Sequence, residues 1–383
     1  MRLILPLLAL LAAVFTIRIH VNPPPIESPT CMRGGCRPDL ILEQLQNSGA
    51  NAESAKAMLL QNASNPNSWC AYGEYLAFTG LNIEAIAAFD RALELGAGLS
   101  AVRMRAANFD FTHDRVKEGL RHIPILLSQT GDFDDVLFFY VQRFASPQDK
   151  LLGGLIPLDA RAARAWLKWS RRNTSADQFV ETWKWMRANS LLDEASRSLA
   201  VQSLWEFKRL PEARTAWKDL SESLPQQGKD REILTNSRFD QEPMRVPFDW
   251  HWEEGPSVQY RQEDGLDVRF LGETNIDLAT LNQAAFVDPG GYHLEVEFSA
   301  DDLSTDQGPF FRISDAEDAK RVLVETQPIL GSATRQTASV NFRAGAGTKA
   351  ILVQLMRRKS ERINNRIKGT LHLYRVSLTP AGE

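Results

Sequence analysis

The residue types best suited to chemistry gather in residues 248–254, Phe-Asp-Trp-His-Trp-Glu-Glu. A flat indole ring can lie under the apolar face of a sugar ring, and carboxylates can accept hydrogen bonds from its hydroxyl groups. In an extended strand Trp250 and Trp252 share one face, and Asp249 lies on the other. The same pattern also fits an aromatic face that packs inside a folded domain. The candidate carbohydrate-binding residues are therefore Trp250, Trp252, Asp249 and Tyr260.

A basic segment, residues 357–368, is the second candidate site. Guanidinium groups bind carboxylates and phosphates through paired hydrogen bonds, so the ligand would be an acidic polysaccharide or a phospholipid headgroup. The segment falls between two predicted strands, which also fits a solvated surface loop. The candidate anion-binding residues are Arg357, Arg358, Arg362 and Arg366.

Signatures of catalysis are missing from the sequence. It has no Gly-x-Ser-x-Gly, His-Glu-x-x-His or Gly-x-x-x-x-Gly-Lys motif and no dinucleotide-binding fingerprint. The six His residues form no close ligand pair, and the acids between Asp301 and Asp318 lack the spacing of an EF-hand loop. We therefore expect no enzyme, no metal and no cofactor, while a calcium ion in the C-terminal domain stays open. The catalytic alternative is a carboxylate pair for glycoside cleavage, for which Asp249 and Glu253 are the first choice.

Length and composition limit the number of domains and the class of protein that can position these residues. The chain has 383 residues, 43% of them hydrophobic, with 44 Lys and Arg against 48 Asp and Glu. That length suggests two or three domains, and the hydrophobic content excludes a largely disordered chain. The net charge of −4 argues against a nucleic-acid-binding protein, because a nucleic-acid backbone requires a strongly basic surface. Three Cys residues are too few for a disulfide scaffold.

Residues 1–21 have the pattern of an export signal, because Met-Arg is followed by an apolar run that ends at Ile17. The run is shorter than the ~20 residues of a typical spanning helix, yet no clear cleavage site follows it. An uncleaved membrane anchor and a cleaved signal peptide therefore both stay open. Residues 22–38 form a Pro-rich linker. Within it Cys31 and Cys36 are a candidate disulfide, since exported proteins meet an oxidising compartment.

Residues 39–224 have the hydrophobic period of helices. Residues 69–92 hold a bulky residue, a bulky–small pair, a small turn residue and a small–aromatic–small triplet. This spacing resembles the tetratricopeptide repeat, a helical hairpin that stacks on its neighbours and usually binds a protein partner. The next unit is degenerate, and Pro124 is expected to interrupt it. Residues 198–220 look like another hairpin. The motif residues are Trp69, Tyr72, Gly73, Gly80, Ala85, Phe89 and Ala92, and the residues expected in the core are Trp166, Trp169, Trp183 and Trp185.

Residues 234–380 contain short runs that alternate between apolar and polar residues, as strands do. Turn signals separate these runs and no helical segment lies between them, which predicts an antiparallel β-sandwich of the jelly-roll type. The opening around Phe239, the Gly-x-Tyr strand at Tyr292 and the closing strand that ends at Leu378 resemble the galactose-binding-like jelly roll of carbohydrate-binding modules. Tyr374 begins a Tyr-Arg pair where that family often has Asp-Asp, which argues against its structural metal. The clear runs are 266–271, 292–298, 322–326, 338–342, 350–355 and 370–378.

The sequence thus predicts a multidomain α plus β chain with an N-terminal membrane helix, helical hairpin repeats and a C-terminal sandwich. This order resembles accessory proteins of bacterial envelope and exopolysaccharide production. The resemblance implies a scaffold anchored in the inner membrane on the periplasmic side, or secreted to the periplasm if the signal is cleaved. Its partners would be a polysaccharide on the sandwich and a protein on the repeats. The alternatives are a protein–protein adaptor with a purely structural sandwich and a polysaccharide-processing enzyme.

Overall fold

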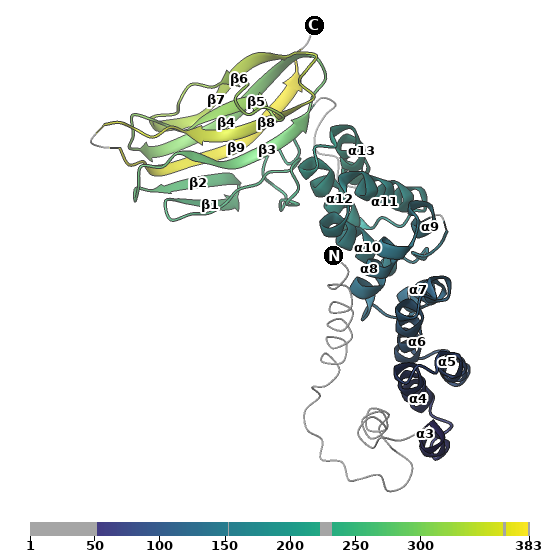
Figure 1. Cartoon of the computed structure of the whole chain (residues 1–383). Coiled ribbons are helices and arrows are strands. Elements are labelled where there is room, and N and C mark those ends of the chain that lie inside the picture. Colours follow the sequence, from purple (N-terminus) through teal and green to yellow (C-terminus); the bar gives the residue numbers. More distant parts are fainter. Residues whose placement is uncertain (1–51, 152, 223–231, 363–364, 382–383) are drawn as a thin grey trace. The chain divides into compact units, whose positions relative to one another are not determined.

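The computed structural model describes residues 52–151, 153–222, 232–362 and 365–381 (Figure 1). The predicted membrane segment, the Pro-rich linker and the candidate disulfide of Cys31 and Cys36 lie outside the described residues. Within the described ranges, no helix has both the length and the apolar character that crossing a membrane requires.

The described chain forms two compact units. Of the described residues, the first unit holds 52–151, 153–173 and 185–191, and the second holds 174–184, 192–222, 232–362 and 365–381. The helices are α3 (Ala52–Leu60), α4 (Pro66–Phe78), α5 (Asn82–Gly96), α6 (Ser100–Thr112), α7 (Val116–Gln129), α8 (Asp134–Phe144), α9 (Pro147–Leu151), α10 (Ala160–Asn173), α11 (Ala176–Ala188), α12 (Glu194–Glu206) and α13 (Leu210–Ser221).

The hairpin of α4 and α5 confirms the predicted repeat motif. A β-carbon added to Gly73 would lie only 2.9 Å from the ring of Phe89, so this position has room for no side chain. Gly80 has a φ of +83° in the turn, a conformation that L side chains rarely adopt. Ala85 and Ala92 are buried beside Phe89 in the same core cluster. Close helix approach therefore depends on small residues at the predicted positions.

Later helices also use a glycine to pack closely against an aromatic ring. A β-carbon on Gly119 of α7 would lie 2.9 Å from the ring of Phe111. The interruption expected at Pro124 is wrong, because α7 continues through it from Val116 to Gln129. The predicted hairpin at residues 198–220 is confirmed as α12 and α13. Pro211 lies in the first turn of α13, where a missing N–H has no cost.

The predicted aromatic core of the helical region is confirmed for Trp166, Trp183 and Trp185, whereas Trp169 is half-buried. Trp166 is buried and stacks on Trp169 with 5.2 Å between ring centroids. Phe138 packs edge-on against Trp166 at 5.2 Å. Trp183 and Trp185 are both buried.

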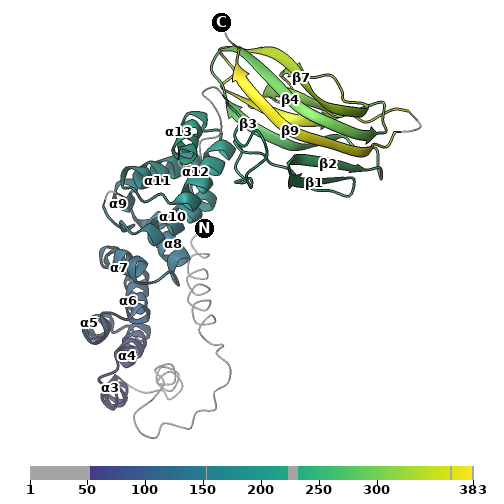
Figure 2. The same cartoon turned by 180° about the vertical axis from the view of Figure 1, so that it is seen from behind.

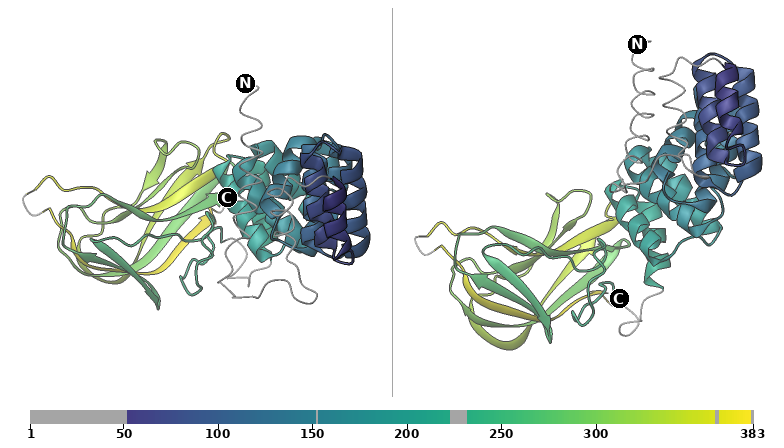
Figure 3. Two further views of the ribbon diagram at one scale, coloured as in Figure 1. Left: turned by 60° about the horizontal axis from the view of Figure 1, so that its bottom comes forward. Right: turned by 90° about the horizontal axis from the view of Figure 1, so that it is seen from below.

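Two antiparallel sheets form the predicted sandwich. The larger sheet has the strand order β1-β2-β9-β4-β7, and Figure 2 labels all five strands. The smaller sheet has the order β3-β8-β5-β6. Figure 3 shows the two sheets from two further directions. The strands are β1 (Val258–Glu263), β2 (Gly265–Leu271), β3 (Leu278–Phe286), β4 (Gly290–Leu303), β5 (Phe310–Asp315), β6 (Val322–Glu325), β7 (Gly331–Ala344), β8 (Ala350–Arg357) and β9 (Lys368–Pro380).

Residues 247–251 run beside the outer edge of β3 instead of forming the regular strand that their sequence suggests. The N–H of Ala284 donates to the carbonyl of Pro247 at 2.7 Å, and His251 forms a single bridge with Asn282. Within the second unit, Phe248 stacks on Phe286 of β3 at 4.5 Å. Rings of α12 and α13 complete this cluster, namely Trp205 at 5.1 Å and Trp217 at 5.4 Å from Phe248.

Candidate functional site

The structure divides the predicted carbohydrate-binding residues between core and surface. Trp250 has no exposed area and lies 5.1 Å from the ring of Phe239, inside the hydrophobic core of the sandwich. Its ring therefore offers no face to a ligand. Asp249 is also buried, and its carboxylate accepts from the N–H groups of Met244 at 2.9 Å and Trp250 at 2.7 Å. Burial raises the pKa of Asp249, although these two hydrogen bonds act in the opposite direction. Both residues are therefore corrected from ligand contacts to structural ones.

Trp252 and Tyr260 lie next to each other, with 6.1 Å between ring centroids. Tyr260 is buried, and its hydroxyl group bonds the hydroxyl of Thr280 at 2.5 Å. Burial raises the pKa of Tyr260 to about 12, so it stays neutral. Trp252 is half-buried against the core. Of the four predicted aromatic and acidic residues, Trp252 is the one with substantial exposed surface.

The predicted anion-binding residues are tied into the fold. Arg357 is fully buried, and its guanidinium donates to the carbonyls of Ile276 and Asn365 and to two side-chain oxygens, of Asn275 and Thr305. Its role is therefore structural, which corrects the prediction for this residue.

The other three arginines of the segment differ in whether their guanidinium groups are already paired with a carboxylate. Arg358 donates from Nη2 to both carboxylate oxygens of Glu325, at 2.8 and 2.6 Å, and covers the ring of Phe310 at 4.5 Å. Arg362 lies 3.3 Å from the carboxylate of Asp306. Arg366 is exposed. The predicted site thus presents far less free positive charge than its sequence indicates.

A different set of polar side chains gathers on the outward side of the five-stranded sheet. Along β4 the residues from Tyr292 to Ala300 alternate between buried and half-exposed, so every second side chain points away from the core. The register pairs Asp267 of β2 and Ser299 of β4 with His372 of β9 from either side. We call this surface the polar face; its residues are Asp267, Glu297, Ser299, Asp301, Arg335, His372 and Tyr374.

His372 bridges two carboxylates at the centre of the polar face. Its Nδ1 lies 2.6 Å from Asp267 Oδ1, and its Nε2 lies 3.0 Å from Asp301 Oδ2. Partial burial of the ring opposes protonation, but the hydrogen bonds to the two carboxylates outweigh it and raise the pKa of His372 above 6.5. The bridge therefore couples three adjacent strands, β2, β9 and β4, most strongly when the imidazole is charged.

Tyr374 supplies an aromatic ring two residues further along β9. Its hydroxyl lies 3.0 Å from the hydroxyl of Ser299. The guanidinium of Arg335 covers the ring at 4.1 Å and donates to Glu297 at 2.6 Å. The polar face thus combines a ring, hydroxyl groups, carboxylates and a guanidinium from four neighbouring strands.

We expect the His372 bridge to make stability depend on pH. A His whose pKa is raised on folding contributes fully below its unfolded pKa of about 6.5, and this contribution is lost as pH rises through the folded pKa. The loss in unfolding free energy caused by His372→Gln should therefore be larger at pH 5 than at pH 8, as measured by urea unfolding. His293→Gln is the matched control, because its ring faces the neutral amide of Asn341 at 2.7 Å. A His372→Gln loss that is equal at both pH values, or larger at pH 8, would contradict the bridge.

Across the described ranges, no group of three or more His, Cys, Asp or Glu side chains is arranged to hold a metal ion. The polar face suits hydrogen bonding to a polyhydroxylated molecule, because donors, acceptors and a ring lie together.

Sequence reasoning missed the polar face, although one signal pointed to it. In the closing strand His372 lies at an outward position between the buried Leu371 and Leu373, and Tyr374 lies at the next outward position. Their partners come from strands up to 105 residues away in the chain, so only the register brings them together.

No family model matches this chain, and no curated protein matches it. Among solved structures, it is similar to one described as "CBM4 structure and function", at 16% identity and a TM-score of 0.30, over 39% of this chain and 99% of that one. It is similar to TmCBM61 in complex with β-1,4-galactotriose, at 13% identity and a TM-score of 0.27, over 40% and 100% of the two chains. It is also similar to YrrB, described as a TPR protein with an unusual peptide-binding site, at 15% identity and a TM-score of 0.25, over 46% and 95%.

Proposed function

We propose that this protein is a non-catalytic binding protein that holds a polysaccharide on the polar face of its sandwich and a protein partner on its helical repeats. The observation that carries the proposal is the position of Tyr374, whose ring lies among the hydrogen-bonding groups of Ser299, Arg335 and Glu297. A sugar has an apolar face and a polar rim, and this surface offers a counterpart to each.

The Tyr374 ring must be uncovered before a sugar can stack on it. Arg335 covers the ring now, but its side chain is 55% exposed and lies on an edge strand. Long exposed side chains change rotamer readily. Once displaced, the guanidinium can donate to sugar hydroxyl groups beside the ring, as Glu297 can accept from them. We therefore assign Arg335 the role of a movable cover.

The test compares aromatic residues on two parts of the sandwich. Tyr374→Ala should weaken polysaccharide binding at least tenfold, a loss of about 1.4 kcal/mol, because one aromatic stacking partner disappears. Binding is measured by affinity electrophoresis and calorimetry with hydroxyethyl cellulose, a β-galactan, chitosan and alginate as probes. Tyr374→Phe should keep most of the affinity, because the ring remains.

Trp252→Ala is the matched control, since Trp252 is a half-exposed ring on another part of the same sandwich. If Trp252→Ala abolishes binding while Tyr374→Ala has no effect, the polar face is the wrong surface. If the unchanged protein binds none of the four probes, polysaccharide binding itself is refuted for these sugar classes.

An acidic polysaccharide is the less favoured ligand. The arginines that would attract it are engaged, Arg357 with carbonyl oxygens and Arg358 with Glu325. Beside the polar face, Glu295 of β4 adds a carboxylate that has no ion-pair partner within the described ranges. Preference for hydroxyethyl cellulose, galactan or chitosan over alginate is therefore part of the proposal.

The setting of the protein is proposed from its sequence. The apolar segment at residues 1–21 would direct the chain out of the cytoplasm and tether it to the inner membrane, with the repeats and the sandwich on the periplasmic side. In the adaptor alternative the sandwich binds no glycan, and in the enzyme alternative a carboxylate pair cleaves one. Release of reducing ends from a bound polymer would favour the enzyme.

A further inference from the structure

The two sheets of the sandwich have four outer edges, and three of them are protected. Unpaired edge strands invite pairing with other chains, so proteins shorten, charge or cover them. The edge strand β6 has only 4 residues. The edge strand β1 has 6 residues and carries the exposed ion pair of Arg261 with Glu263. The edge of β3 is covered by residues 247–251, through Pro247 and His251.

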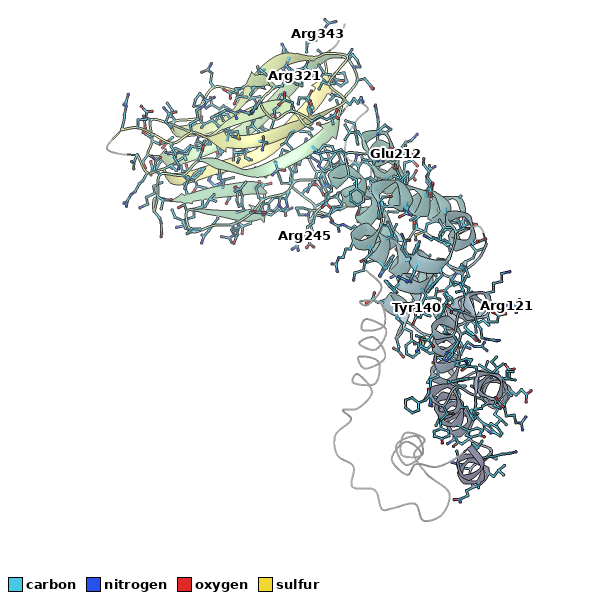
Figure 4. All side chains as sticks on the ribbon, in the orientation of Figure 1. Arg121, Tyr140, Glu212, Arg245, Arg321 and Arg343 are labelled. Atoms are coloured by element: carbon cyan, nitrogen blue, oxygen red, sulfur yellow. The ribbon has the colours of Figure 1, made fainter. Side chains whose placement is uncertain are left out.

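The fourth edge, β7, is neither short nor covered, and its charges lie only toward its two ends. It is 14 residues long, contains no Pro, and carries charge only at Arg335 and Arg343. Arg335 is already paired with Glu297 of the adjacent strand. Arg343, labelled in Figure 4, lies near the end of the strand. The stretch between the two arginines is therefore long, regular and uncharged, the usual profile of a strand that pairs.

The direction of the open backbone groups follows from bonds on the other side of the sheet. On β9, Val376 N–H donates to Ser237 and Leu378 C=O accepts from Ile233, so these even-numbered residues point away from β4. The odd-numbered Ser377 and Thr379 therefore point toward β4. Backbone groups alternate in direction along a strand.

The direction of the backbone groups of β4 follows from that of β9. Ser377 of β9 pairs with Glu295, so the odd-numbered residues of β4 point their N–H and C=O groups toward β9. The even-numbered residues of β4 therefore point toward β7, and Leu294 pairs there with Val340. An independent bond agrees, because Gly291 C=O accepts from Ala381 beyond β9. On β7 the even-numbered residues thus bond β4, while the odd-numbered ones direct N–H and C=O to the open edge. The described chain provides no partner for that edge.

We propose that β7 pairs with β7 of a second copy of this chain, antiparallel about a two-fold axis at Ala338. An identical strand offers the same alternation, so each open donor meets an acceptor without any further chain. This axis places Thr337 opposite Ser339 of the second copy and Arg335 opposite Asn341 of the second copy. An axis at Ser339 would instead place Arg335 opposite Arg343 of the second copy, which like-charge repulsion disfavours.

The pairing joins two five-stranded sheets into one ten-stranded sheet. A two-fold axis perpendicular to the sheet leaves the polar faces of both copies on the same side. Thr337, Ser339 and Asn341 all have exposed side chains, which would lie between the two faces. A polymer that contacts both faces would be held more tightly than by one, because the second contact is intramolecular.

The test uses the full chain in a mild detergent, with mass measured by sedimentation equilibrium over a range of concentrations. The unchanged protein should reach twice the 43.0 kDa of one chain. Ser339→Pro removes one open N–H and leaves the bonds to β4 intact, so dimerisation should weaken at least tenfold. Ser339→Ala is the matched control: it removes the hydroxyl but keeps the backbone, and the dimer should persist.

Hydrogen exchange gives a second readout that does not depend on a variant folding. The amides of Thr337, Ser339 and Asn341 should become protected as concentration rises, while that of Val340 stays protected throughout. A chain that is monomeric at every concentration, a dimer that Ser339→Pro does not weaken, or edge amides whose exchange is independent of concentration would each overturn the proposal.

Discussion

Trp250→Ala is expected to destabilise the sandwich by about 3–5 kcal/mol, the usual cost of deleting a large buried aromatic side chain. The indole of Trp250 has no exposed area and packs against Phe239. Its removal loses the contacts of the ring and leaves a cavity that the surrounding strands can fill only in part. Urea unfolding followed by near-ultraviolet circular dichroism measures the change as a lower midpoint at unchanged slope.

Trp252→Ala shows whether the loss of stability from Trp250→Ala comes from burial of the ring or from removal of any Trp. Its ring is half-exposed and lies beside Tyr260, so we expect a loss of about 1–2 kcal/mol. Ligand binding by the two variants must be compared at a temperature and urea concentration at which both are folded. An unfolded Trp250→Ala protein would also lose any ligand. If Trp250→Ala keeps full stability and loses only ligand binding, then Trp250 is a surface residue and its assignment to the core is wrong.

The helical region was predictable because its determinants are local. The contact of Gly73 with Phe89 joins two helices that follow each other directly, so a fixed spacing in the sequence encodes it. The same logic identified the hairpin of α12 and α13 around Pro211. Pro124 misled the prediction, because a Pro in the interior of a helix usually breaks it, whereas α7 continues through it.

Alternation predicted the strands β2, β4, β6, β7, β8 and β9 and missed β1, β3 and β5, although β1 also alternates between buried and exposed residues. In β4 and β9 polar side chains separate the buried ones, so the period of two is visible. In β5 both Phe310 and Phe311 are buried, because Arg312 and Arg358 cover the outward ring of Phe310. A strand buried on both sides has no alternation to detect.

The candidate site was the least predictable part. Residues 248–254 alternate like a strand, but they pair with β3 only through one isolated bridge at His251, and Trp250 turns into the core. The polar face depends on register, which aligns residues that lie far apart in the sequence. Charge was misleading as well, because the local cluster of arginines meets its acids, Glu325 and Asp306, only after folding.

Arg357→Ala is expected to destabilise the sandwich by about 3–5 kcal/mol. The guanidinium of Arg357 is fully buried, and it donates to the carbonyls of Ile276 and Asn365, which lie in separate loops. Truncation would leave partly buried carbonyl oxygens without this donor and open a cavity the size of the side chain. Arg357→Lys should restore only part of the loss, because one ammonium group lacks the planar fork that reaches both loops.

Arg358→Ala, one residue further on, is the matched control for the Arg357 variants. Arg358 is 51% exposed, and its ion pair with Glu325 lies at the surface, where such pairs contribute about 0.2–1 kcal/mol. Urea unfolding of the Arg357 and Arg358 variants should therefore give a large and a small change for neighbouring arginines. Equal losses, or a loss from Arg357→Ala that disappears in high salt, would mean that Arg357 acts as a surface charge and is free to meet an anionic ligand after all.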